Sequence, residues 1–123
     1  QPREAYKHGM LTQILFEAFQ SLHIFPLSQV IHKNLHYTSP NLTDPIITRE
    51  EFLIHIQGVF DANRYSPEGR MQASLLVDEN TGLPYLQLTY PEGFVDRVDI
   101  ESQHNLITEI RISNVKRGKK ETK

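Results

Sequence analysis

GFVDRVDIESQHNLITEIRIS, residues 93–113, predicts two β-strands that meet at a tight polar turn. In the first strand the side chains of Phe94, Asp96, Val98 and Ile100 recur at period two and therefore share one face. Asp96 is the exception in an otherwise apolar row. A carboxylate in a core-facing row costs on the order of several kcal/mol unless it is paired, neutralised or open to a cavity. Asp96 is therefore the first candidate for chemistry.

The segments around this hairpin predict three more strands. Apolar and polar residues alternate over residues 71–77 and 86–90, on either side of a turn at residues 78–82. Residues 35–39 are rich in strand-forming side chains and are followed by Pro40, which ends a strand. In the last strand, Leu106, Thr108, Ile110 and Ile112 are expected on one face.

Helices are predicted upstream of these strands. Apolar residues recur at helical spacing over residues 3–22, with Gly9 as a point where the helix could break. A short helix is expected over residues 27–32, entered through Pro26. Thr48-Arg-Glu-Glu51 matches a capping box and starts a third helix that extends to about residue 63. This order favours an α+β fold, with three helices on one face of a curved, mainly antiparallel sheet and a pocket between the two layers.

Composition limits the class of protein. The 123 residues contain no cysteine, which excludes disulfides, thiol nucleophiles and thiolate metal sites. The net charge is −2, but the last eight residues, KRGKKETK, carry five Lys or Arg against one Glu, so the part before them is about −6. We expect a single domain at residues 1–114 and a basic, disordered tail at residues 115–123. The acidic body, the missing membrane span and the missing signal segment favour a soluble cytoplasmic protein with neither a nucleic-acid nor a membrane partner.

Several segments together resemble the nuclear-transport-factor-2-like (NTF2-like) superfamily. They are Tyr37-Thr-Ser-Pro40, Ile47-Thr-Arg-Glu-Glu-Phe52, Phe94-Val-Asp-Arg-Val-Asp-Ile100 and Leu106-Ile-Thr-Glu-Ile110. Within it, the chain is most similar to the SnoaL-like (polyketide-cyclase-like) and ketosteroid-isomerase-like proteins, over roughly residues 11–113. The resemblance implies a cone-shaped fold. It does not imply one activity, because this scaffold carries enzymes, binding domains and dimerisation modules.

The resemblance assigns roles at particular positions. Asp96 falls where ketosteroid isomerases place the carboxylic acid of their oxyanion hole. That acid is a well-known case of a carboxyl group kept neutral by an apolar site. The catalytic base of those enzymes would fall at about Ser39, and their oxyanion-hole tyrosine near Leu15 or Phe16. Ser39 cannot act as the base that abstracts the proton, and neither Leu15 nor Phe16 can donate a hydrogen bond to an oxyanion. The isomerase reaction itself is therefore not expected.

Other side chains are weaker candidates. Arg97-Val-Asp99 resembles the Arg-x-Asp of limonene-epoxide-hydrolase-like proteins, but alternation places both side chains on the face away from Asp96. His55, beside the apolar stripe of the third helix, is a candidate base or polar contact. His32 and His36 are expected on different elements, and we expect no metal and no cofactor. The side chains expected to line a ligand pocket are Tyr37, Phe16, Phe52, Phe60, Tyr85 and Phe94.

Two classes of function follow, and whether the protein is an enzyme is left open. The first is a domain that binds a small hydrophobic molecule between helices and sheet, with Asp96 either as a ligand contact or as a structural carboxylate. The second is an isomerase, cyclase or dehydratase that uses Asp96, with His55 and a tyrosine, as its acid–base set. A third possibility is a module that binds another protein. We also expect a homodimer through the exposed sheet face, which should carry Val95, Ile107, Leu76 and Tyr85.

Overall fold

A computed structural model of the chain describes residues 2–116, with three helices and five strands. The helices are α1 (Pro2–Ser21), α2 (Phe25–Ser28) and α3 (Arg49–Arg64). The strands are β1 (Ile31–Thr38), β2 (Gln72–Val77), β3 (Pro84–Thr89), β4 (Val95–Gln103) and β5 (Leu106–Lys116). No helix in this range is both long and apolar enough to cross a membrane.

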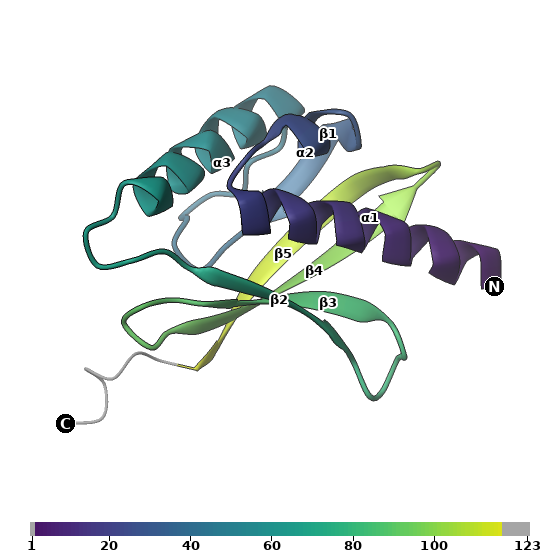
Figure 1. Ribbon diagram of the computed structural model, residues 1–123. Coiled ribbons are helices and arrows are strands. Elements are labelled where there is room, and N and C mark those ends of the chain that lie inside the picture. The colour runs from purple at the N-terminus through teal and green to yellow at the C-terminus, as the bar shows by residue number, and fades with distance from the viewer. Residues whose placement is uncertain (1, 117–123) are drawn as a thin grey trace.

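The strands form one mixed sheet in the order β1-β5-β4-β3-β2. β1 runs parallel to β5, whereas the other neighbours are antiparallel. Figure 1 shows α1 and α3 on the same side of the sheet, with α1 crossing it and α3 beside β1. The predicted α+β class is confirmed, and the sheet has a helix-covered face and an open face.

The core fills the space between the helices and the sheet. Its largest fully buried side chains come from both layers, as expected when an amphipathic helix packs on the apolar face of a sheet. They are Phe52, Phe60, Leu15, Leu27, Ile31, Leu35, Ile56, Met71, Leu86, Leu88, Ile107 and Ile110.

The helix ends follow local rules. The Thr48 hydroxyl accepts a hydrogen bond from the Glu51 backbone N–H over 3.2 Å, which confirms the predicted start of α3. At the C-terminal end of α1, the Arg70 guanidinium donates to the carbonyls of Phe19 (3.0 Å) and Gln20 (2.6 Å), which have no partner within the helix. Gly9 does not break α1, which continues through it to Ser21.

The segment between α1 and β1 differs from its prediction. We expected a helix over residues 27–32 and a strand from residue 35, but α2 ends at Ser28 and β1 begins at Ile31. Pro26 occupies the first turn of α2, as predicted, and the helix is a single turn. Pairing with β5 explains the early strand: the Ile107 N–H donates to the Val30 carbonyl over 2.7 Å, and Ile31 lies opposite Ile107. His32 and His36 therefore share β1, rather than lying on different elements.

A shift in strand register changes which residues of β5 lie on the open face of the sheet. Glu101 pairs with Glu109 but Ser102 pairs with Ile107, so β5 contains one extra residue at this point. The extra residue moves Ile107 to the helix-covered face, where it is fully buried, and the prediction that it lies on the open face was wrong. β5 also extends to Lys116, so residues 115 and 116 are part of a strand; the rest of the predicted tail lies outside the described residues.

Candidate functional site

Asp96 lies on the helix-covered face of the sheet, as the alternation predicted. Val98 and Ile100, which follow it on this face, are buried at 1% and 4% exposure, whereas Asp96 is half-buried. Its neighbour on β3 is the buried Leu88, and its neighbour on β5 is Asn114. The Asn114 side-chain amide donates a hydrogen bond to Oδ1 of Asp96 over 3.0 Å.

Tyr90 is the first aromatic neighbour of this carboxylate. Because Leu88 pairs with Asp96, Tyr90 lies diagonally across the β3–β4 hairpin, and its backbone N–H donates to the Phe94 carbonyl over 2.9 Å. Burial raises the pKa of Tyr90 above its ordinary value, and the negative charge of Asp96 raises it further. The Tyr90 hydroxyl therefore stays protonated beside the carboxylate at neutral pH.

Tyr37 of β1 is a second tyrosine within electrostatic range of Asp96. Its side chain is only 3% exposed, and its ring packs against the rings of Phe52 and His55 at centroid distances of 5.1 and 5.4 Å. Burial, with a smaller contribution from the charge of Asp96, raises the pKa of Tyr37 to about 12, although a hydrogen bond with Ser39 opposes the shift. Tyr37, Tyr90, Asp96 and Asn114 are together called the Asp96 cluster below.

Asp96 has no ionic partner in the part of the chain that the structure describes. Its hydrogen-bond donor among residues 2–116 is the neutral Asn114 amide, and its charge lies close enough to Tyr90 to raise the pKa of that phenol. A carboxylate in this setting can accept a further hydrogen bond, bind a cation or exchange a proton with a ligand.

No known protein family and no curated protein matches the sequence. Solved structures do match the fold. An NTF2-like protein from Anabaena variabilis aligns at a TM-score of 0.67 and 10% identity, over 94% of this chain and 92% of its own. The chain has the NTF2-like fold. A steroid delta-isomerase from Pseudomonas aeruginosa aligns at 0.64 and 9% identity, over 89% and 80% of the two chains. An epoxide hydrolase of the limonene-epoxide-hydrolase-like type from M. tuberculosis aligns at 0.63 and 11% identity, over 89% and 84%.

In this NTF2-like fold, some of the predicted site residues come together and others do not. Tyr37 lies within electrostatic range of Asp96, and the His55 ring contacts the Tyr37 ring. Phe52 packs against the Tyr37 ring, and Phe94, 39% exposed, immediately precedes β4, two residues before Asp96.

The remaining predicted pocket residues lie elsewhere. Phe60 is fully buried and packs edge-on against Phe19 with ring centroids 5.1 Å apart, and Phe16 is half-buried against the core. The deep interior at Phe60 is therefore occupied by the protein's own side chains. Tyr85 is on the open face, where its ring lies 3.9 Å from the Arg97 guanidinium. Tyr85 thus has no part in the Asp96 cluster.

Sequence reasoning missed the full extent of an ionic cluster on the open face of the NTF2-like sheet. The Arg97 guanidinium binds both oxygens of Asp99 at 2.9–3.1 Å and reaches Asp78 of the β2–β3 turn at 2.8 Å. The hydrogen bond from Arg97, followed by those from the backbone N–H groups of Thr81 and Asn80, holds the pKa of Asp78 below its usual value. Spacing in the sequence placed Arg97 and Asp99 on one face but carried no signal for Asp78, which is 19 residues away.

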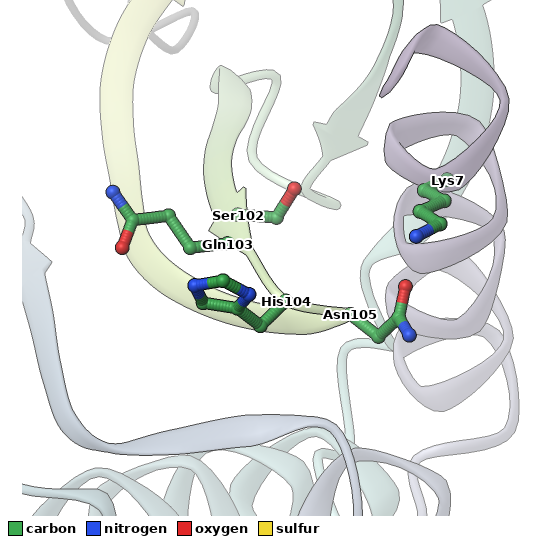
Figure 2. Close-up of a pocket in the computed structure, with 5 residues that line it drawn as sticks. All are labelled: Lys7, Ser102, Gln103, His104 and Asn105. Carbon is green, nitrogen blue, oxygen red and sulfur yellow. The ribbon is translucent and has the colours of Figure 1, made fainter. Parts of the chain in front are cut away.

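Two clefts lie at the opposite end of the fold from the β3–β4 turn. One has a volume of about 210 Å³ and is lined by Lys7 and by Ser102, Gln103, His104 and Asn105. Figure 2 shows Lys7 of α1 facing Asn105 at the β4–β5 turn. The other, of about 200 Å³, lies between His8 and the open-face residues Arg97, Asp99 and Arg111. No group of three or more potential metal ligands occurs in the described part of the chain.

Proposed function

We propose that this NTF2-like protein binds a small, largely apolar molecule at the mouth of the helix–sheet layer, with Asp96 as the polar contact. One observation carries the proposal: a half-buried carboxylate without an ionic partner among residues 2–116 lies within electrostatic range of the buried Tyr37 and the half-buried Tyr90. A half-buried carboxylate without an ionic partner lowers the stability of a fold, and such groups are concentrated at functional sites. The exposed Phe94, two residues before Asp96, supplies apolar surface, and the His55 ring packs against Tyr37.

The ligand would lie near the surface rather than deep in a cone. Phe52 and Phe60 have no exposed area, and they occupy the interior that a larger ligand would need. A molecule with a single ring or a short chain could contact Phe94 and still place one polar group at Asp96. This size limit separates the proposal from the binding of a polycyclic molecule.

Thermal unfolding in the presence of a ligand panel tests this function. The panel contains steroids, aromatic polyketide-like compounds, fatty acids and small single-ring compounds. A ligand that binds the native state raises the unfolding temperature, and Asp96→Asn should reduce that rise. Asp99→Asn is the matched control, because Asp99 lies on the same strand but on the open face. An equal loss in both variants, or no rise with any compound, would contradict the proposal.

A second candidate function is acid–base catalysis of an isomerase, cyclase or dehydratase type. It is favoured by the contact between the rings of Tyr37 and His55, which brings a second titratable group to the Asp96 cluster. If a ligand from the panel is converted to product, His55→Gln should lower kcat while leaving KM within about twofold. Binding without turnover in the wild-type protein would exclude this function for that ligand.

A homodimer through the open face is a further proposal. Leu76, 36% exposed, and Tyr85 lie on this face, beside the charged row that contains Arg97 and Arg111. The face is thus less apolar than its alternating sequence suggested, and a dimer there would have to pair charges as well as apolar side chains. Sedimentation equilibrium decides between a mass of 14.3 kDa and twice that value, and Tyr85→Glu should dissociate a dimer. A monomer at all accessible concentrations would leave the open face to a different protein partner.

A further inference from the structure

One edge of the sheet is open. β2 is the last strand in the order β1-β5-β4-β3-β2, so among residues 2–116 it has a neighbouring strand on one side only. It pairs with β3 over six consecutive residues without a bulge. The opposite edge is covered in part, because Tyr37 of β1 exchanges backbone hydrogen bonds of 2.8 and 2.9 Å with Ile46. β2 is therefore the edge at which a further strand could pair.

The pairing with β3 determines which backbone groups β2 presents at this edge. Just after the strand, the Asp78 N–H donates to the Leu83 carbonyl over 2.9 Å. In an antiparallel pair, the N–H and C=O of every second residue point to the same neighbouring strand, so the even-numbered residues of β2 face β3. The N–H and C=O groups of Ala73, Leu75 and Val77 therefore point away from β3, toward the open edge.

Side chains close this edge at Met71, one step before β2. The Met71 N–H donates to Oδ1 of Asn63 over 2.8 Å, and the Met71 carbonyl accepts from Nε of Arg70 over 3.2 Å. Among residues 2–116, neither a loop nor a side chain bonds in this way to the next three odd-numbered positions. The free part of the edge is thus limited to these three positions and is centred on Leu75.

The side chains along the edge are uncharged and largely apolar. β2 has the sequence QASLLV, which contains neither a charged residue nor a proline. Leu75, Leu76 and Val77 are exposed at 36%, 36% and 63%. Proteins usually protect a free edge with lysine, proline, a bulge or a covering segment, because such an edge otherwise pairs with another chain. In the part of the chain that the structure describes, β2 has none of these protections.

We propose that β2 pairs antiparallel with β2 of a second copy of this chain, with the two-fold axis at Leu75, so that the two sheets become continuous. In this register Leu75 faces Leu75 of the second copy and Ala73 faces its Val77, so each free N–H meets a free C=O. A shift by two residues in one direction would place Val77 opposite Met71, whose backbone groups are already bonded. A shift in the other direction would place Ala73 opposite Glu79, which lies in the β2–β3 turn.

The side chains on the helix-covered face fit this register. Ala73 and Leu75 lie on that face, because their partners on β3 are the buried Leu88 and Leu86. Pairing of the two copies would place Ala73 opposite Val77 at both ends and Leu75 opposite itself at the centre. The result is a row of apolar cross-strand pairs that covers side chains left exposed in a single copy.

The charges at the two ends of β2 are complementary as well. Arg70 precedes the strand, and Asp78 and Glu79 follow it. An antiparallel second copy therefore brings a basic end next to an acidic end at both sides of the two-fold axis. On the open face, Gln72 comes opposite Asp78 of the second copy, where its amide can donate to the carboxylate. No like charges face each other in this register.

This interface is separate from the open-face dimer and from the Asp96 cluster. It consists of one short strand edge, which is smaller than a standard protein–protein interface, so we expect a Kd on the order of 10–100 μM. A dimer of this affinity forms and dissociates within the range of concentration that NMR covers.

Amide hydrogen exchange in the wild-type protein, followed by NMR as a function of concentration, tests the register. The amides of Ser74 and Leu76, which face β3, should be protected at every concentration. The amides of Ala73, Leu75 and Val77 should exchange at least about fivefold more slowly when the protein is concentrated to about 1 mM. A dimer through the open face would not produce this alternation of odd and even positions.

Variants test the same interface by sedimentation equilibrium. Leu75→Lys places like charges at the two-fold axis and should give a mass of 14.3 kDa at concentrations where the wild type is dimeric. Val77→Pro removes an edge N–H without removing a bond to β3, and it should also weaken the dimer. Tyr85→Glu is the matched control, because Tyr85 lies beside Leu76 on the open face and should leave an edge dimer intact. Circular dichroism shows whether each variant is folded.

Three outcomes would overturn the inference. The first is a wild-type protein that stays monomeric at about 1 mM, with exchange that does not depend on concentration. The second is a dimer that Tyr85→Glu dissociates, without protection of the odd-numbered amides, because such a dimer uses the open face. The third is protection of these amides that persists in monomeric Leu75→Lys, because the edge would then be covered within one chain. The proposed ligand-binding function stands in all three cases.

Discussion

The side-chain amide of Asn114 donates to the carboxylate of Asp96 over 3.0 Å, across the antiparallel pair of β4 and β5. Eighteen residues separate the two in the chain. The bond fixes one oxygen of the carboxylate and leaves the other oxygen available. The bond also joins β4, which carries Asp96, to β5, which lies between β4 and the strand of Tyr37, β1.

Replacing Asp96 by Asn should stabilise the protein slightly. The amide is nearly isosteric and can still accept from Asn114, while the cost of a half-buried charge disappears. We expect a gain of about 1 kcal/mol in the free energy of unfolding, measured with urea. The same variant should lower the pKa of Tyr37 and Tyr90, whose shifts include the charge of Asp96. A loss of more than about 1 kcal/mol would mean that the carboxylate is structural.

Stability should fall at alkaline pH because of Tyr37. Its pKa is raised in the folded protein from 10.0 to about 12, so the folded state holds this proton where the unfolded state has released it. The contribution to stability is complete below about pH 10 and is lost as the pH rises toward about 12. Urea unfolding across this range, with tyrosinate absorbance as the titration signal, measures the slope. Tyr37→Phe should reduce the slope, and an unchanged slope would contradict the burial of the hydroxyl.

Arg97 should stabilise the open face through geometry as well as charge. Its fork binds both oxygens of Asp99 and its plane stacks on Tyr85, neither of which a lysine ammonium can reproduce. We expect Arg97→Lys and Arg97→Gln both to cost on the order of 1 kcal/mol in chemical denaturation. If the lysine variant were as stable as wild type, charge alone would account for the contact.

Acid should weaken the same cluster. The pKa of Asp78 lies below its usual 3.8, first because of Arg97, so its contribution to stability is present above about pH 3.8 and is lost as the pH falls through the lowered value. Arg97→Gln should therefore flatten the pH dependence of unfolding in this acid range, as followed by circular dichroism.

The filled interior makes Phe60 a sensitive position. Phe60 is fully buried against Phe19, so Phe60→Ala removes a ring and leaves a cavity. The loss should be about 3–5 kcal/mol in the free energy of unfolding. Ile54→Ala on the same helix is the control, because Ile54 is 75% exposed and its loss should change stability by less than about 0.5 kcal/mol. Comparable effects at the two positions would contradict the packing of α3.

The start of α3 depends on one hydroxyl. Thr48→Ala removes the acceptor for the Glu51 N–H and should cost about 1 kcal/mol, whereas Thr48→Ser keeps the oxygen and should cost little. Thermal unfolding of the two variants measures the difference. If alanine and serine behave alike, the cap does not contribute to stability.

Local patterns in the sequence predicted much of this fold. The capping box at Thr48 started α3 at the right residue, and the period of two placed Asp96 in the apolar row of β4. These features depend on neighbours within a few positions along the chain, where spacing decides which side chains share a face. The order of such elements predicted the α+β class, and the resemblance of several segments implied the NTF2-like fold, which the solved structures confirm.

Non-local pairing determined what local patterns could not. β1 begins at Ile31 because β5 lies beside it, and the extra residue in β5 buries Ile107, although the alternation had placed it on the open face. The same holds for the site: alternation along β4 was enough to place a carboxylate on the face toward the helices. The hydrogen bond from Asn114 and the nearness of two tyrosines could not be predicted locally, because strand register is set by packing between segments far apart in the chain.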